Sequence, residues 1–204
     1  QRSKLDDFVI SSEQTHFRFT ADHTAWAVYS AQGVYSKVTL SKIKNNCERP
    51  TTIRIDDETY AAVGEAALVD YARMRLSPAK GQPNTLVSSL ASEVKAAAPF
   101  STPWRFILLG DTPGQLLERN YLLLNLNEPC AIKDPSWIKP GKVIREVTLT
   151  TKGGMACVDF AAKHNLQYVE YDAGWYGPEG SAESDARTIT LDPGRSKGPL
   201  DLHA

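Results

Sequence analysis

Asp172 and Trp175 are the residues whose types and spacing best suit contact with a ligand. They end the stretch Leu166 to Gly177 (LQYVEYDAGWYG), which begins as an apolar run rich in β-branched and aromatic residues. Such a run is typical of a buried parallel strand. Gly174 allows the backbone to turn at the end of the strand, where Asp172 offers a carboxylate and Trp175 a flat ring.

The elements that would position these residues lie just upstream. Lys142 to Leu149 (KVIREVTL) predicts a strand, and Thr151 to His164 predicts a helix. Strand, helix and strand of these lengths form one βαβ unit, the building block of a parallel barrel or open sheet. Two strands and one helix cannot close a barrel, which needs eight strands. We therefore expect this part of the chain to be a piece of a larger protein.

The first third of the chain has the alternating pattern of short antiparallel strands, with turn signals between them. This predicts part of a β-sandwich, with further strands expected before Gln1. The expected strands are His16 to Thr20, Ala25 to Tyr29, Ser36 to Ile43 and Thr51 to Asp56.

The middle of the chain predicts helices and then a linker. Ala61 to Leu76 favours a helix by propensity, although Gly64 before Glu65 could instead mark a close approach of backbone to a ligand. A strand is expected over Ser101 to Gly110. Asp111-Thr112-Pro113-Gly114 then supplies a capping side chain and a proline at the first helical position, and the helix is expected to continue over Gln115 to Asn125. We expect a sandwich domain over 1–126, a linker with three prolines over 127–141, and the start of a barrel over 142–204.

Composition limits the partners of this chain. Its 204 residues carry a net charge of −1, so no basic field favours nucleic acid, and no run is long enough to span a membrane. The odd number of cysteines (Cys47, Cys130 and Cys157) fits neither a disulfide framework nor a zinc pattern. We expect buried free thiols. The sequence does not indicate an oligomeric state.

Taken together, several stretches resemble glycoside hydrolase family 97, α-glucosidases and α-galactosidases that act on oligosaccharides outside the cytoplasm. The strand that ends in Asp172-Ala173-Gly174-Trp175 follows them at the matching distance. The stretches are Thr24-Ala25-Trp26, Gly64 to Tyr71, Thr102-Pro103-Trp104-Arg105 through Leu126-Asn127-Glu128-Pro129, and Ser136 to Lys142.

The resemblance implies a β-sandwich domain packed on a (β/α)8 barrel, of which this chain holds only the beginning. It implies a calcium ion beside the active site with Glu65 as one ligand, completed by oxygen ligands from beyond this chain. The alternative without a metal is that Glu65 is a solvent-exposed glutamate on a helix. The catalytic carboxylates would lie on later strands, outside this chain. A periplasmic or secreted location is also implied.

Asp172 and Trp175 would then touch a sugar by hydrogen bonding and stacking. Alternatively, Asp172 caps the following loop and Trp175 packs beneath it. Glu170 and Asp172 share a strand face, as a glycosidase carboxylate pair would require, but Glu170 is expected to sit deeper, away from the strand end. Arg145 and Glu146 stand where family members often have an aromatic strand end, which bears on substrate preference.

Three functions remain open from the sequence. The first is a calcium-assisted α-glycosidase that releases a terminal α-linked glucose or galactose, with retention or inversion decided by strands outside this chain. The second is a carbohydrate-binding or scaffold protein that keeps the fold without the chemistry. The third is an inactive proteolytic fragment.

Overall fold

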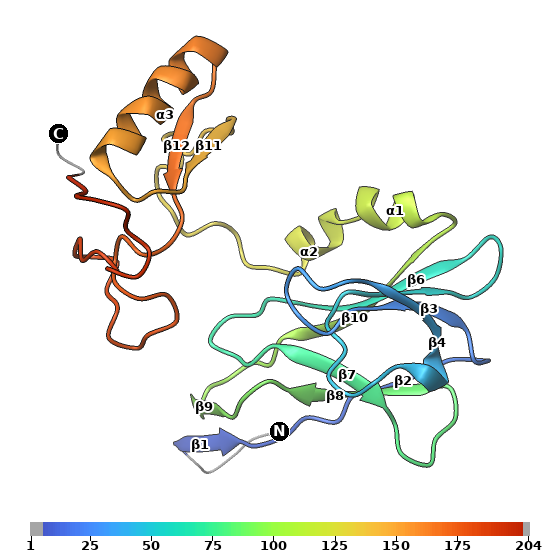
Figure 1. Ribbon diagram of the computed structural model, residues 1–204. Helices are drawn as coiled ribbons and strands as arrows, with labels where there is room; N and C mark the ends of the chain where they lie inside the picture. The colour runs from blue at the N-terminus through green and yellow to red at the C-terminus, as the bar shows by residue number, and fades with distance from the viewer. Residues whose placement is uncertain (1–5, 202–204) are drawn as a thin grey trace. The chain divides into compact units, whose positions relative to one another are not determined.

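The computed structural model describes residues 6–201 (Figure 1). The chain divides into two compact units, Gln1–Cys130 (unit 1) and Ala131–Ala204 (unit 2). This division lies inside the stretch 127–141 that the sequence analysis expects to be a linker. The two units are described separately below.

Unit 1 consists mainly of antiparallel sheets. A five-stranded sheet has the order β10-β6-β5-β3-β4, a three-stranded sheet has the order β2-β8-β7, and β1 pairs with β9. The strands are β1 (Asp7–Ile10), β2 (His16–Arg18), β3 (Thr24–Ala27), β4 (Ser36–Thr39), β5 (Thr51–Arg54), β6 (Tyr60–Ala66), β7 (Met74–Pro78), β8 (Thr85–Leu90), β9 (Val94–Ala97) and β10 (Trp104–Gly110). A short 3-10 helix covers Leu40–Lys42.

The core of unit 1 is made by residues from both larger sheets. Ile53 on β5 and Val63 on β6 are fully buried, together with Leu76 on β7 and Leu86 on β8. Alternate residues of β5 turn outward, so Arg54 is exposed while its neighbour Ile53 is not. This is the pattern of a strand with one face against a core. The antiparallel sheets agree with the sandwich expected from the sequence.

The helix predicted over Ala61 to Leu76 is wrong. The segment forms β6, which pairs with β5 on one side and β10 on the other, and then β7 after an irregular link. Good helix formers occur here because a central strand needs small side chains. A Cβ added at Gly64 would lie 2.5 Å from Cζ of Phe106 on β10. Tertiary packing therefore overrides the helix propensity of the alanines.

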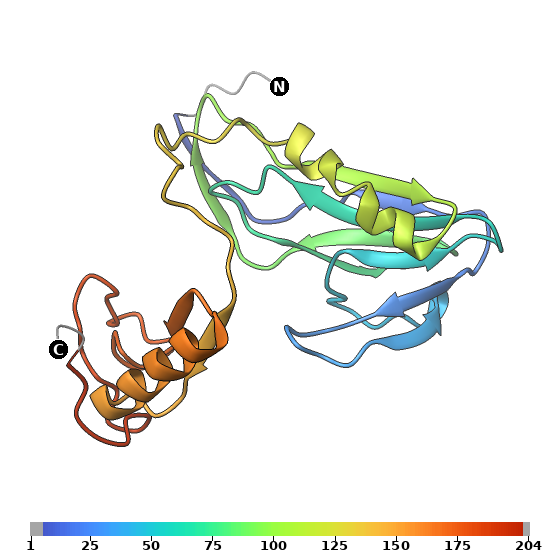
Figure 2. The same ribbon diagram turned by 90° about the horizontal axis from the view of Figure 1, so that it is seen from above.

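The helix predicted over Gln115 to Asn125 is present as two shorter pieces, α1 (Pro113–Glu118) and α2 (Tyr121–Asn125). Its predicted start is confirmed. Pro113 occupies the first turn, and the Thr112 hydroxyl accepts a hydrogen bond from the Gln115 N–H. In Figure 2, both helices lie along β10.

Unit 2 contains the predicted βαβ unit. Strands β11 (Val143–Glu146) and β12 (Tyr168–Tyr171) are parallel and hydrogen-bonded, and α3 (Thr151–His164) connects them. Thr150 caps α3 at its start, and Asn165 ends it in the left-handed conformation, with φ at 54°. That this unit begins a (β/α)8 barrel remains a prediction.

An irregular segment follows β12, as the sequence analysis expects, and its backbone returns to the βαβ unit. Thr190 and Asp192 donate their N–H groups to the carbonyls of Trp175 and Gly174. Lys197 N–H likewise donates to the Thr148 carbonyl, next to the start of α3. The segment after the strand end is thus ordered by backbone hydrogen bonds.

Two further expectations are tested by the fold. The cysteines are free, as predicted, but of the three only Cys47 is buried. Cys157 is partly exposed on α3, and Cys130 is exposed in the linker region. Between residues 6 and 201, no helix has the length and apolar character to cross a membrane.

Candidate functional site

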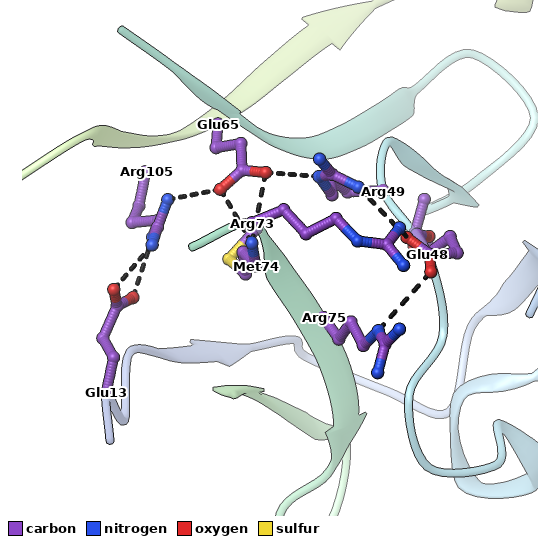
Figure 3. A network of polar contacts seen from close by, with 9 residues as sticks. Glu13, Glu48, Arg49, Glu65, Arg73, Met74, Arg75 and Arg105 are labelled. Carbon is purple, nitrogen blue, oxygen red and sulfur yellow. Dashed lines mark hydrogen bonds and ion pairs between the residues drawn. The ribbon is translucent and has the colours of Figure 1, made fainter. Parts of the chain in front are cut away.

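Glu65 lies on β6 with its side chain only 4 % exposed, so it is neither helical nor solvated. Its carboxylate accepts hydrogen bonds from three donors (Figure 3). Arg49 Nε donates to Oε1, and Arg105 Nη1 donates to Oε2 at 2.6 Å. The backbone N–H of Met74 is shared between the two oxygens, at 3.2 Å and 2.9 Å. Glu65 therefore links the five-stranded sheet to the first residue of β7 in the three-stranded sheet.

Glu13 continues this arrangement beyond Arg105. The Arg105 guanidinium donates to both oxygens of Glu13, at 2.7 Å and 2.6 Å, in a bidentate pair. Glu13 also accepts from the hydroxyls of Thr15, Ser88 and Tyr71. Figure 3 shows Arg105 between the carboxylates of Glu13 and Glu65.

Glu48 continues the arrangement beyond Arg49. Its Oε2 accepts from Nη1 of Arg49 at 3.0 Å and from Nη1 of Arg73 at 2.5 Å. Nε of Arg75 lies 3.5 Å from the other Glu48 oxygen. The carboxylates and guanidiniums therefore alternate in the order Glu13, Arg105, Glu65, Arg49 and Glu48, which we call the ion network.

The ion network shifts the pKa values of its members. Burial raises the pKa of Glu13, but the hydrogen bond and positive charge of Arg105 outweigh it, so the pKa is lowered. Burial lowers the pKa of Arg105, but the hydrogen bond and negative charge of Glu13 outweigh this effect, so the pKa is raised. The pKa of the Tyr71 phenol is raised by burial and by the negative charge of Glu13. The shifts of Glu13 and Arg105 favour the ionised network at neutral pH, whereas the shift of Tyr71 keeps its phenol neutral.

Glu65 does not fit the calcium site that the resemblance implies. Calcium takes six to eight oxygen ligands, whereas the atoms around this carboxylate are nitrogen donors. A divalent cation there would also face two guanidiniums. Across residues 6–201, no group of three or more His, Cys, Asp or Glu residues could hold a metal ion. The donors that the described residues place around Glu65 therefore suit pairing with guanidiniums rather than with calcium.

An apolar groove of about 630 Å³ is bounded by β6, β10 and α1. Phe106 and Leu108 line it from β10, Leu116 lines it from α1, and Arg49 and Glu65 are also among its lining residues. Gly64, which the sequence suggested for close approach to a ligand, is instead in contact with the Phe106 ring. Its lack of a side chain is explained by packing within the sheet.

Asp172 lies directly after β12 and forms an ion pair with Arg145 on β11. Their side chains are 46 % and 55 % exposed, so solvent reaches both. A small pocket of about 140 Å³ at this edge is lined by both residues and by Arg195. The carboxyl ends of parallel strands are where such sheets bind ligands. The lining of this pocket thus contains two carboxylates, Asp172 and Glu146, and two guanidiniums.

Trp175 is outside the residues that line this small pocket. Its ring packs edge-on against the neighbouring Tyr176, with centroids 5.1 Å apart and an angle of 86° between the planes. The described contacts therefore do not bring Trp175 and Asp172 together. Packing on a neighbour agrees with the alternative in which the ring is structural.

Glu170 faces away from α3, on the same side of the sheet as Asp172, because alternate residues of a strand face opposite sides. It is exposed rather than set into an interior, and its backbone lies opposite Arg145 in the parallel register. The neighbouring Tyr171 faces α3, where its hydroxyl lies 2.0 Å from the place of a Cβ at Gly154.

Glu146 is a site residue whose environment the sequence analysis missed. It is buried and accepts hydrogen bonds from the N–H groups of Thr148 at 2.8 Å and Leu149 at 2.6 Å, and from the Thr148 hydroxyl. Burial raises the pKa of Glu146, but these hydrogen bonds outweigh it and hold the pKa below its ordinary value. The sequence signal that could have indicated this arrangement is an acidic residue at the strand end that is followed by Thr148, Thr150 and Gly153.

Comparison with known proteins identifies the class of protein. The family model described as "Glycosyl-hydrolase 97 N-terminal" matches residues 1–129, which is more than half of the chain. The chain therefore belongs to glycoside hydrolase family 97, and it covers the N-terminal region of that family.

Two curated relatives are named as α-galactosidases. A "Probable retaining alpha-galactosidase" from Streptomyces bingchenggensis is 30 % identical over 128 residues, which cover 58 % of this chain and 20 % of the relative. A "Retaining alpha-galactosidase" from Bacteroides thetaiotaomicron is 26 % identical over 223 residues, which cover 82 % of this chain and 33 % of the relative. The chain spans about a third of these relatives or less.

A similar solved structure is a family 97 enzyme from Pseudoalteromonas sp. strain K8, in complex with acarbose. It has a TM-score of 0.70 and 32 % identity, and the match covers 86 % of this chain and 31 % of that chain. A variant of the same enzyme has been solved in complex with panose.

Proposed function

We propose that this chain is the N-terminal part of a retaining α-glycosidase that releases a terminal α-linked hexose from oligosaccharides. Membership of family 97 carries the proposal, supported by two curated relatives named as retaining α-galactosidases. Galactose is accordingly the first candidate for the released sugar. Glucose is the second, because the similar solved enzyme binds acarbose and panose.

In this proposal unit 1 is a supporting β-sandwich, and β11, α3 and β12 of unit 2 begin the catalytic barrel. Active sites on such barrels are built at the carboxyl ends of the strands. A retaining enzyme needs two carboxyl groups about 5–5.5 Å apart, and both are expected on strands beyond this chain. The residues of this chain would bind and orient the sugar.

Asp172 is the residue of this chain that we propose to contact the substrate. Its carboxylate lies at the carboxyl end of β12 and accepts hydrogen bonds, so it suits sugar hydroxyls. The ion pair with Arg145 orients this carboxylate, which suits a binding role. Trp175 would add the face of an apolar ring at the same strand end.

The resemblance also implies calcium, whereas the proposed contacts of Asp172 and Trp175 with the sugar need no metal ion. A calcium site at Glu65 would require release of the carboxylate from Arg49 and Arg105, with other oxygen ligands from outside the described residues. We also propose a periplasmic or secreted location, which fractionation of the producing cells would test.

The test uses the intact natural protein with 4-nitrophenyl α-galactoside and 4-nitrophenyl α-glucoside. We expect hydrolysis of at least one, and we expect Asp172→Asn to raise KM more than it lowers kcat, because binding contacts act before the chemical step. Asp159→Asn, an exposed residue of α3, is the control and should behave as wild type. Binding of an oligosaccharide without any hydrolysis would favour a carbohydrate-binding or scaffold protein instead.

A further inference from the structure

We propose that Glu65 is not a metal ligand in this protein but the central carboxylate of the ion network, with guanidiniums in the place of a cation. The proposal rests on the donors around the carboxylate, on its burial and on the charge order along the network. It departs from the role that family resemblance gives to this position.

Three N–H donors already occupy most of the acceptor positions of the Glu65 carboxylate. A carboxylate offers about four acceptor positions. Oε1 accepts from Arg49 Nε and from the Met74 N–H, and Oε2 accepts from Arg105 Nη1 and the same N–H. With the side chain 4 % exposed, water has little access to either oxygen. A calcium ion could bind this carboxylate only by displacing at least one of the two guanidiniums.

The charges around Glu65 also exclude a divalent cation. Arg49 and Arg105 are themselves little exposed, at 19 % and 9 %, so solvent screens their charges only in part. Each guanidinium is shared with an outer carboxylate, Glu48 or Glu13. Adding a further two positive charges between them would be repulsive, whereas the present order alternates in sign. Guanidiniums also match carboxylates in geometry, since their donors are fixed in a plane.

The position of Glu65 gives the arrangement a structural role. Arg105 is on β10 next to Glu65 on β6, while Met74 begins β7 in the three-stranded sheet. Glu13 precedes β2, and Arg49 precedes β5. One carboxylate therefore joins segments that are distant in sequence. Its removal would leave two guanidiniums facing each other in a buried space, which is strongly destabilising.

The experiment compares intact wild-type protein with Glu65→Gln, Arg49→Met and the control Glu58→Gln, which changes an exposed carboxylate of unit 1. Thermal unfolding is measured in EGTA and in calcium chloride, and calcium binding is measured by calorimetry. We expect Glu65→Gln to lower the Tm by about 10 °C in EGTA, because a buried ion pair loses one partner. Its calcium affinity should stay within about twofold of wild type, and Glu58→Gln should change neither quantity.

A loss of calcium affinity of tenfold or more in Glu65→Gln, with an unchanged Tm in EGTA, would overturn the proposal. Should Glu65→Gln not fold, Arg49→Met decides. We expect Arg49→Met to lower the Tm and leave calcium affinity unchanged. If Glu65 is a calcium ligand, removal of the neighbouring guanidinium would instead raise calcium affinity by tenfold or more, and that result would refute the proposal.

Discussion

Replacement of Glu146 by Gln tests whether this buried carboxylate holds the turn between β11 and α3. Glu146 accepts from the N–H groups of Thr148 and Leu149, and Leu149 has the left-handed φ of 50°, which is uncommon for a non-glycine residue. Glutamine has the same size, but it has only one acceptor oxygen, and its amide nitrogen would face backbone donors. The turn would therefore lose at least one charge-assisted hydrogen bond.

The expected cost follows from that loss. A hydrogen bond to a charged group contributes about 1.5–3 kcal/mol net, so opening of the turn should become easier by about 2 kcal/mol. This corresponds to a roughly 30-fold larger equilibrium constant for opening of the turn, since every 1.4 kcal/mol is a factor of ten. Hydrogen–deuterium exchange of the intact protein would report it in peptides that cover residues 147–154.

Glu170→Gln is the matched control, because it changes an exposed carboxylate on the neighbouring strand. Exchange over 147–154 should be as in wild type for this control. Unchanged exchange in Glu146→Gln would refute the reasoning, since the carboxylate would then contribute nothing to the turn.

Three further predictions concern other sites. Because the pKa of Glu13 is lowered in the folded protein, the stability that Glu13 contributes is present above the ordinary carboxyl pKa and is lost as pH falls through the folded-state pKa. The Tm of Glu13→Gln should therefore depend less on pH between 7 and 3 than the Tm of wild type. An unchanged pH dependence would contradict this. Gly154→Ala should destabilise the protein by about 1–3 kcal/mol in urea unfolding, because the added Cβ would lie 2.0 Å from the Tyr171 hydroxyl, and Tyr171→Phe should recover part of the loss. Gly64→Ala should cost a similar amount through contact with Phe106, and Phe106→Leu should relieve it; no recovery would argue against a steric cause.

The parts of the fold that follow from local pattern were predictable. The βαβ unit was expected from an apolar strand, a helix of suitable length and a second strand, and β11, α3 and β12 confirm it. The start of α1 was expected from Thr112 and Pro113, because a capping hydroxyl and a proline at the first turn are local signals.

The stretch around β6 was not predictable from local propensity. Its alanines favour a helix, but strands on both sides and the Phe106 ring require small residues there. After β6, Ala67 and Asp70 have a left-handed backbone conformation, with φ of 53° and 48°. No local sequence motif predicts this conformation at either residue. Tertiary contacts decided the outcome.

The environments of the candidate site residues were also hidden in the sequence. Glu65 meets Arg49 and Arg105, which are 16 and 40 positions away, so only the folded sheets bring them together. Arg145 was noted as a departure from the family pattern, but its pairing with Asp172 depends on the parallel register.

The most direct test of the proposed function is to incubate the intact protein with an α-linked substrate and follow the anomeric signals of the released hexose by proton NMR. We expect α-galactose or α-glucose to form first and then to mutarotate, as for a retaining enzyme. No release from either substrate by folded, intact protein would contradict it, and initial formation of the β-anomer would contradict the retaining mechanism.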